Sequence, residues 1–382
     1  MFGTETNKEM LNNKKFLIIS NYAYSLINVR SQLLIDIKSK SVRVAALAPK
    51  CSEDLRNKID EIVDDYIYLK INRSSINPLF EIVTFLNIVK ALFRYRPDNI
   101  LAVTIKPIIW GGLASRFFNV RFTALITGLG YTFQKSGFFR SIIRKLLIYL
   151  FRFSLKNAHS VIFQNSDIMD TFIKLKIIEP EICTVVEGSG VDLDHFEFSE
   201  LPETQDITFL CIARLLSEKG VREYAEAAKH FSKSNNKVKF VLLGTEYNGP
   251  DAINIQEVKS WTSSGYIKHI EETDDVRPYI RSCHVFVLPS YHEGIPRSTL
   301  EAMSMGRPII TTDAVGCRDT VVDGVNGKLI SVKSKSELIE SIVWCLENTD
   351  KLSSMGIESR KIAKKRFSLE LINNQMLEAI GL

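Results

Sequence analysis

The chain lacks three features that would place it across a membrane or outside the cell. It holds no run of about 18 uncharged apolar residues, so no membrane-spanning helix is predicted. Its first fifteen residues are charged and contain no apolar run, so no signal peptide is expected. Its six cysteines form no CxxC pair, which indicates reduced thiols and a cytoplasmic protein.

Acidic residues are scarce in one long segment. Residues 90–156 contain twelve Lys and Arg but only one acid, Asp98, although the formal net charge of the whole chain is only +5. So concentrated a basic surface favours an anionic partner, such as a lipid leaflet or a phosphorylated ligand. Nucleic acid is a weaker interpretation, because no recognised nucleic-acid-binding module accompanies the basic residues.

The length and the apolar pattern predict two α/β domains. A chain of 382 residues suits two domains of roughly 180 residues each. Short β-rich runs alternate with amphipathic stretches, which is typical of parallel sheets with crossover helices. The predicted strands are residues 16–20, 42–48, 100–104, 122–126 and 161–164 in the first half, and 208–213, 239–243, 284–288 and 308–312 in the second.

Two glycines and several acids interrupt this pattern at residues 187–194, so we place the boundary near residue 190. The predicted domains are residues 1–190 and 191–365, followed by a C-terminal helix in 366–382 that we expect to pack back on the first domain. Each domain is interpreted as a doubly wound sheet, and two such sheets are expected to face each other across a deep cleft that binds ligands.

The most informative stretch is residues 286–327, in which a buried strand is followed by a loop with Glu293 and then by a helix from about Pro296 to Met305. The free amides at the start of a helix favour an anion. Glu293 and Glu301 flank that position, and a carboxylate can accept two hydrogen bonds from adjacent sugar hydroxyls. Alternatively, the two glutamates are ordinary helix charges.

A second stretch, residues 213–221 (ARLLSEKGV), places two cations where a strand passes into a helix. Arg214 ends the strand, and Lys219 precedes Gly220, which permits a tight turn. Such a pair can neutralise a pyrophosphate leaving group. The alternative is two surface cations near a turn.

Together, ARLLSEKG, EGIPRSTLEAMSMGRPII and TDAVGCRDTVVDGVNGKLI resemble family 4 of the retaining glycosyltransferases over residues 207–331. The runs ITGLGYTF (126–133) and TIKP (104–107) resemble the branch that builds capsule, O-antigen and lipid-linked glycans. The resemblance implies the GT-B architecture, with an N-terminal acceptor-binding domain and a C-terminal domain that binds the nucleotide sugar.

The resemblance also implies roles for individual residues. Arg214 and Lys219 would bind the donor diphosphate, Glu293 would bind the transferred sugar, and Glu301 would hold the ribose hydroxyls. The phosphates would contact the backbone at 294–297, and the base would lie against 265–270. The implied donor-binding set is Arg214, Lys219, Gly244, Ile267, Glu293, Gly294, Ile295, Pro296, Arg297, Leu300 and Glu301, of which Arg214, Lys219 and Glu293 would be catalytic.

The implied reaction uses no metal and no cofactor. The acceptor hydroxyl would attack on the face from which the diphosphate leaves, and a phosphate oxygen would take its proton. The DxD at 192–194 lies in the predicted hinge, so we do not assign it a metal. The GxG at 128–130 lacks the third glycine of a dinucleotide fingerprint.

The first domain departs from the family in having no histidine before His159. The position that corresponds to the usual histidine falls in the TIKP run, where Lys106 would contact acceptor or donor unless it is only a surface lysine. Gly128, Gly130 and Tyr131 are the other expected cleft residues on the acceptor side.

Residues 135–156 (KSGFFRSIIRKLLIYLFRFSLK) predict a basic amphipathic helix. Such a helix can lie in the headgroup region of an anionic leaflet, and the alternative is a core helix with a solvated basic face. The predicted contact residues are Arg140, Arg144, Lys145 and Arg152.

The sequence therefore predicts a metal-independent, retaining GT-B glycosyltransferase, peripheral to the inner face of the cell membrane. It would move a hexose-type sugar, an N-acetylhexosamine by expectation, from a UDP-sugar to a polyprenyl-diphosphate-linked saccharide. The preference for UDP over GDP rests on the resemblance alone. Two other functions stay open: a UDP-N-acetylhexosamine 2-epimerase of similar fold and a catalytically silent membrane scaffold.

Overall fold

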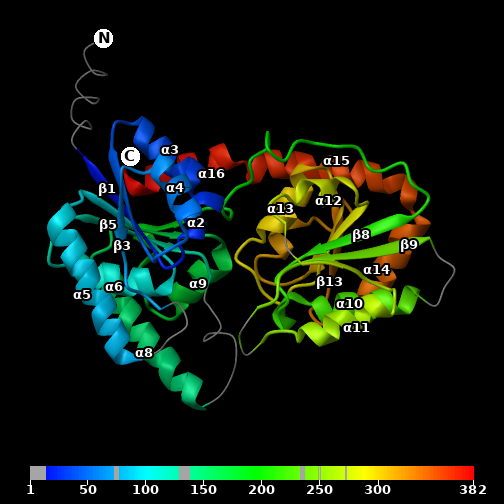
Figure 1. Cartoon of the computed structure of the whole chain (residues 1–382), viewed down its shortest axis with the longest axis horizontal. Coiled ribbons are helices and arrows are strands. Elements are labelled where there is room, and N and C mark those ends of the chain that lie inside the picture. Colours follow the sequence, from blue (N-terminus) through cyan, green and yellow to red (C-terminus); the bar gives the residue numbers. More distant parts are fainter. Residues whose placement is uncertain are drawn as a thin grey trace, which may run out of the picture. The chain divides into compact units, whose positions relative to one another are not determined.

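The computed structural model describes residues 14–72, 77–128, 138–232, 237–247, 249, 251–271 and 273–382. The chain divides into two compact units (Figure 1). Unit 1 comprises residues 1–186 together with 372–382, and unit 2 comprises residues 187–371. The change of unit at 186/187 lies four residues before the start of the predicted second domain.

Unit 1 is built on a seven-stranded parallel sheet in the order β3-β2-β1-β4-β5-β6-β7. The strand order reverses between β1 and β4, as in other doubly wound sheets. The strands are β1 (Lys15–Ser20), β2 (Arg43–Ala48), β3 (Asp65–Tyr68), β4 (Asn99–Val103), β5 (Arg121–Ile126), β6 (Ser160–Phe163) and β7 (Cys183–Val185).

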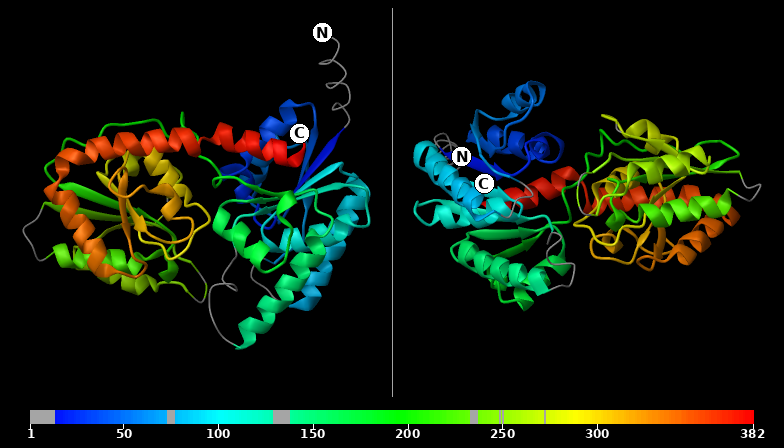
Figure 2. Two further views of the ribbon diagram at one scale, coloured as in Figure 1. Left: turned by 180° about the vertical axis from the view of Figure 1, so that it is seen from behind. Right: turned by 60° about the horizontal axis from the view of Figure 1, so that its bottom comes forward.

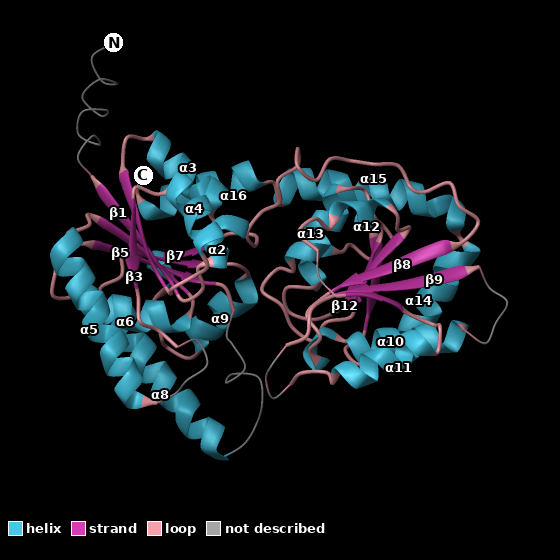
Figure 3. Cartoon of the chain, viewed as in Figure 1, coloured by secondary structure: helices cyan, strands magenta, loops and turns pink. Residues whose placement is uncertain are grey.

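Helices cover both faces of this sheet, which is why its central strands are apolar on both sides (Figure 3). One face carries α5 (Pro78–Tyr95), α6 (Ile105–Ser115), α8 (Phe138–Leu155) and α9 (Ser166–Lys174). The other carries α2 (Tyr24–Asn28), α3 (Ser31–Ser39), α4 (Glu53–Ile62) and the C-terminal α16 (Leu369–Ile380).

The last helix returns to the first unit, beside α3 and α4 (Figures 1 and 2). Its Ile372, Met376 and Ile380 are fully buried in the core cluster that also contains Phe16 and Ile18 of β1. The chain therefore passes between the units twice, and its last helix forms part of the core of unit 1.

Unit 2 contains a six-stranded parallel sheet in the order β10-β9-β8-β11-β12-β13. The strands are β8 (Ile207–Ile212), β9 (Val238–Leu243), β10 (Lys268–Ile270), β11 (Val285–Leu288), β12 (Ile309–Thr312) and β13 (Gly327–Ile330). One core cluster packs around it, with helices α10 (Val221–Phe231), α11 (Ile255–Ser263), α12 (Arg277–Arg281), α13 (Arg297–Ser304), α14 (Lys335–Glu347) and α15 (Thr349–Arg366).

Three short 3-10 helices complete the described elements, at Pro180–Ile182, Ser217–Lys219 and Arg318–Thr320. The prediction of two doubly wound parallel-sheet units is confirmed. In unit 2 the strand order reverses between β8 and β11, and the loops after these strands carry both predicted motifs.

Candidate functional site in unit 2

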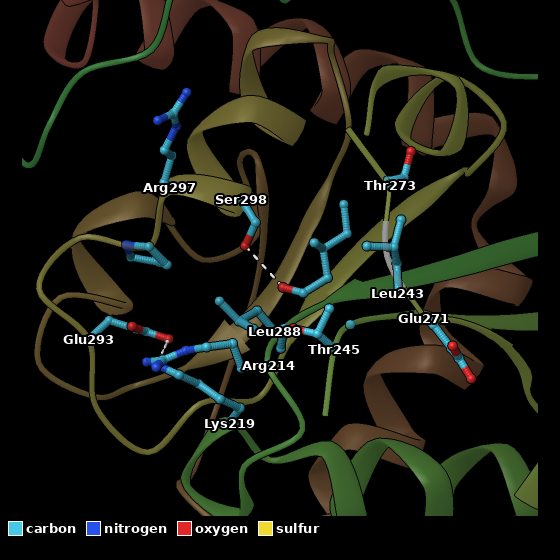
Figure 4. Close-up of a pocket in the computed structure, with 14 residues that line it drawn as sticks. Arg214, Lys219, Leu243, Thr245, Glu271, Thr273, Leu288, Glu293, Arg297 and Ser298 are labelled. Atoms are coloured by element: carbon cyan, nitrogen blue, oxygen red, sulfur yellow. Dashed lines mark hydrogen bonds and ion pairs between the residues drawn. The ribbon is translucent and has the colours of Figure 1, made fainter. Parts of the chain in front are cut away.

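A cavity of about 370 Å³ lies at the carboxyl ends of β8, β9 and β11, where open α/β sheets bind ligands. Figure 4 shows its lining side chains as sticks. The lining residues come from the loops after these three strands, from the start of α13 and from the segment after β10. They are Ile212, Ala213, Arg214, Lys219, Leu243, Gly244, Thr245, Glu271, Thr273, Leu288, Glu293, Pro296, Arg297 and Ser298.

An ion pair joins the two motifs inside this cavity. Lys219 Nζ lies 2.6 Å from Glu293 Oε1, and the two side chains are only 11% and 16% exposed. The Arg214 side chain is directed toward the same carboxylate (Figure 4). The buried Lys219 and the exposed Arg214 therefore face one carboxylate, an arrangement that leaves net positive charge for an anionic ligand.

The backbone around Gly220 places Lys219. Gly220 has φ +69°, and it ends the 3-10 turn Ser217–Lys219 before α10 begins at Val221. A Cβ at this position would lie 2.0 Å from the carbonyl oxygen of Pro289, in the loop after β11. Gly220 is thus required both for its left-handed conformation and for the close approach of the two loops.

The loop that carries Glu293 is held from two sides. The Glu293 amide donates to the Val315 carbonyl at 3.0 Å, and the Tyr291 amide donates to the Glu218 carbonyl at 2.8 Å. A Cβ at Gly316 would lie 2.0 Å from the Gly294 carbonyl oxygen, so the loop after β12 also packs closely here. These contacts fix the Glu293 backbone relative to the turn that carries Lys219.

Arg214 is positioned by an aromatic ring. Its guanidinium carbon lies 5.2 Å from the centre of the Tyr247 ring, within the range of a cation–π contact. Tyr247 follows β9, so residues after β8 and β9 together orient the cation.

Helix α13 begins at the cavity, as the sequence predicted, with Pro296 as its N-cap residue. No side chain caps this end. The Ser298 hydroxyl donates to the Ile212 carbonyl at 3.1 Å, which ties the first turn to the end of β8. The first-turn amides and the helix dipole add positive potential on the side where the cations lie.

The second predicted carboxylate, Glu301, lies one turn into α13 and is 8% exposed. Its Oε1 accepts from Arg297 Nε at 2.9 Å. Burial raises the pKa of the Glu301 carboxyl, and the Arg297 guanidinium opposes that rise. Arg297 itself is directed away from the Lys219–Glu293 pair (Figure 4).

The structure brings together part of the predicted donor-binding set. Six of those residues line the cavity: Arg214, Lys219, Gly244, Glu293, Pro296 and Arg297. The others lie outside the cavity lining: Ile267, Ile295 and Leu300 are buried in the core cluster, Gly294 packs its carbonyl on Gly316, and Glu301 pairs with Arg297. Their predicted contacts with a nucleotide stay predictions.

Four polar lining residues were not predicted, namely Thr245, Glu271, Thr273 and Ser298. Thr245 lies two residues after β9, and Glu271 directly follows β10. Position after a parallel strand is the signal that would have indicated both. The β10 strand itself was not predicted.

In unit 1, Lys106 is an internal ion-pair partner. Its Nζ lies 2.5 Å from Glu81 Oε1 and donates to the Asn72 carbonyl at 2.7 Å. Trp110 Nε1 donates to the other oxygen of Glu81 at 2.6 Å. The alternative interpretation of Lys106 as a surface lysine is not supported, because its side chain is only 17% exposed, and the predicted contact with a ligand stays a prediction.

Only some of the other predicted cleft and membrane-contact residues of unit 1 are described by the structure. Gly128 is described, but Gly130 and Tyr131 and the side chain of Arg140 lie outside the described residues. Arg144 and Lys145 are exposed on α8. Arg152 donates from its guanidinium to the carbonyls of Leu175 and Lys176, at 2.7 and 2.9 Å. It therefore ties α8 to the loop that follows α9.

In the DxD sequence, the Asp192 side chain stabilises a local turn. Asp192 Oδ1 accepts from the amides of Asp194 and His195 at 3.0 and 2.9 Å. In the part of the chain that the structure describes, no three His, Cys, Asp or Glu side chains gather as a metal site would require. No helix among the described residues combines the length and apolar character needed to cross a bilayer.

We expect Gly220→Ala to destabilise unit 2 by more than about 3 kcal/mol, because it combines left-handed strain with the Pro289 clash. Gly265→Ala is the matched control, since Gly265 has φ +79° but a Cβ added there would meet nothing within 4 Å. That variant should lose only about 1–2 kcal/mol. Urea unfolding of both variants measures the difference, and equal losses would show that the close approach is not needed.

Comparison with known proteins places this site in a family. Residues 194–362, nearly all of unit 2, match the family described as "Glycosyl transferases group 1". The N,N'-diacetylbacillosaminyl-diphospho-undecaprenol alpha-1,3-N-acetylgalactosaminyltransferase of Campylobacter jejuni is 27% identical over 86% of this chain and 89% of its own length. The UDP-Gal:alpha-D-GlcNAc-diphosphoundecaprenol alpha-1,3-galactosyltransferase of Escherichia coli is 24% identical over 77% and 78%.

Solved structures share the fold of the whole chain. Anabaena HepE in complex with UDP has a TM-score of 0.78 at 18% identity, covering 96% of this chain and 99% of its own. Sucrose-phosphate synthase from Thermosynechococcus elongatus also has a TM-score of 0.78, at 17% identity, with 96% and 98% covered. The resemblance predicted from the motifs is confirmed: residues 194–362 match the family model of the group 1 glycosyltransferases, and both relatives are named as glycosyltransferases.

Proposed function

We propose that this glycosyltransferase moves an N-acetylhexosamine from a UDP-sugar to a polyprenyl-diphosphate-linked saccharide, with retention of configuration and without a metal. The observation that carries the proposal is the Lys219–Glu293 pair beside Arg214, at the N-terminus of α13. Cations and a carboxylate within one cavity suit a ligand that joins a diphosphate to a sugar.

The cations would stabilise the leaving diphosphate. A lysine ammonium has three N–H donors, of which Lys219 uses one for Glu293. The remaining donors, the Arg214 guanidinium and the first-turn amides of α13 would face the charge that develops on the phosphates. Because the fold itself holds these groups in place, little reorganisation is needed during the reaction.

Glu293 would orient the transferred sugar. One of its oxygens accepts from Lys219, so the second can accept from a sugar hydroxyl. Glu301 would bind the ribose hydroxyls, and the Arg297 guanidinium opposes the rise in the pKa of its carboxyl that burial causes.

In the reaction, the acceptor oxygen forms its bond to the anomeric carbon while the bond from that carbon to the diphosphate oxygen breaks. The acceptor proton passes to a phosphate oxygen of the leaving group on the same face. No protein carboxylate acts as a covalent nucleophile in this scheme. The protein contributes positioning and charge stabilisation.

The names of the relatives and the charge of unit 1 support the proposed acceptor and location. The C. jejuni and E. coli relatives are named for diphospho-undecaprenol acceptors. A lipid-linked acceptor requires the enzyme to meet a membrane surface, for which we propose the cytoplasmic face. The excess of basic residues in 90–156 would attract both anionic lipid and the acceptor diphosphate.

Release of UDP from a panel of UDP-sugars, with and without polyprenyl-diphosphate-linked saccharide, tests the function. We expect release to require one particular UDP-sugar and the acceptor, to persist in EDTA, and to give a product with the anomeric configuration of the donor by NMR. UDP-N-acetylhexosamine interconversion without acceptor would indicate the epimerase instead. Absence of donor consumption with both UDP- and GDP-sugars would contradict transferase activity.

Glu293→Gln keeps the size of the side chain but removes its charge. We expect kcat/KM for transfer to fall by about 100-fold, because the sugar loses a charged acceptor and Lys219 loses its partner. Glu271→Gln is the matched control, since Glu271 lines the cavity on the side away from the ion pair (Figure 4) and should change activity less than threefold, about 0.6 kcal/mol. Equal activity of both variants would contradict the role of Glu293.

A further inference from the structure

Two helices of unit 1 expose apolar side chains at helical spacing. On α8, Ile142, Leu146, Tyr149 and Phe153 are each 53–57% exposed. On α5, Leu79, Ile82, Leu86 and Phe93 are each 54–72% exposed. The α8 positions recur every three or four residues, and those of α5 do so up to Leu86, with Phe93 seven residues (two turns) further on, so each set forms one stripe along its helix. We refer to the two stripes together as the apolar face.

The two stripes point away from the same sheet. Ile88 and Leu92 of α5 and Phe151 and Leu155 of α8 are buried in one core cluster beneath the seven-stranded sheet. On each helix these buried residues lie opposite the exposed stripe at 100° per residue. Both helices pack against α6, and the views of Figures 1 and 2 show α5, α6 and α8 in one layer.

The charges around the apolar face have one sign. Lys90 falls within the α5 stripe, Arg94 lies beside it, and Lys145 flanks the α8 stripe, all three exposed. The sequence of α8 contains no acid. The only acid of α5 is Glu81, whose carboxylate is turned to Lys106 and Trp110.

We propose that the apolar face is the surface by which the protein lies on an anionic lipid leaflet, with the stripes of α5 and α8 entering the headgroup and acyl boundary. Large apolar side chains flanked by lysine and arginine match that boundary, where apolar area and charge attraction both contribute. A second copy of the chain is a poorer occupant, because like charges would face each other across the contact.

This inference rests on the proposed lipid-linked acceptor, and it goes beyond the basic residues of α8 alone. It assigns the main contact to exposed apolar residues and adds α5 as a second contact helix. Arg152 plays a smaller part here, since its guanidinium is already bonded to backbone carbonyls.

Co-sedimentation of the full chain with vesicles tests the proposal. The vesicles contain either phosphatidylcholine alone or equal parts phosphatidylcholine and phosphatidylglycerol. We expect binding to the anionic vesicles, and a loss of at least about tenfold in the partition coefficient for the double variant L86E/L146E. K90E/K145E should lower the partition coefficient on the anionic vesicles by about fivefold for each unit of positive charge removed.

Ile35→Glu is the matched control. Ile35 is 42% exposed on α3, whose buried residues pack in the cluster on the opposite face of the sheet. It should leave vesicle binding unchanged. Melting temperatures of all variants, with and without UDP, report folding and the donor site separately.

Failure to bind anionic vesicles, or equal loss in Ile35→Glu and L86E/L146E, would overturn the membrane surface. If UDP still raised the melting temperature in that case, the proposed donor site would be supported although the membrane surface would not. A dimer in sedimentation velocity that L86E/L146E dissociates would assign the face to a second copy and also overturn the proposal.

Discussion

The ion pair between Lys219 and Glu293 is the interaction around which the site is organised. The two residues are 74 positions apart in the chain, and each stands on a loop after a different strand. Charges at so low an exposure require a partner, since an isolated buried ion costs several kcal/mol. The two side chains satisfy each other, and a diphosphate would bind on the side of this pair where the cations lie.

That pairing depends on backbone that only glycine permits. Gly220 and Gly316 both have positive φ, and a Cβ on either would lie 2.0 Å from a carbonyl oxygen of the loop that carries Glu293. The three loops after β8, β11 and β12 therefore hold one another, and a rigid sheet positions all three. This need for glycine explains why the two sequence motifs contain glycines close to their charged residues.

The sequence predicted the interior strands of both sheets but not their margins. The four unpredicted strands are β3, β7, β10 and β13, and each is the edge strand of its sheet. An edge strand has one hydrogen-bonded neighbour and partial burial, so short segments such as Lys268–Ile270 lack the continuous apolar run that marks a central strand. The cavity residues Glu271 and Thr273 were missed for this reason, because they follow one of these edges.

The helix α8 shows a different limit of sequence reasoning. The sequence predicted a basic amphipathic helix here, and in the structure Leu147 and Leu150 are partly buried against the core. Because apolar residues occur on two sides of this helix, its sequence does not indicate which of these sides neighbouring elements will cover. Only the packing against α6 distinguishes the buried side from the exposed stripe.

Calorimetric titration with UDP and UMP tests the central claim, that unit 2 presents a preformed site for a nucleoside diphosphate. The account predicts that UDP binds at least about tenfold more tightly than UMP, because the second phosphate meets Arg214 and Lys219. It also predicts that Lys219→Met removes most of this advantage while leaving UMP binding nearly unchanged. Equal affinities for the two nucleotides, or an unchanged preference in Lys219→Met, would contradict it.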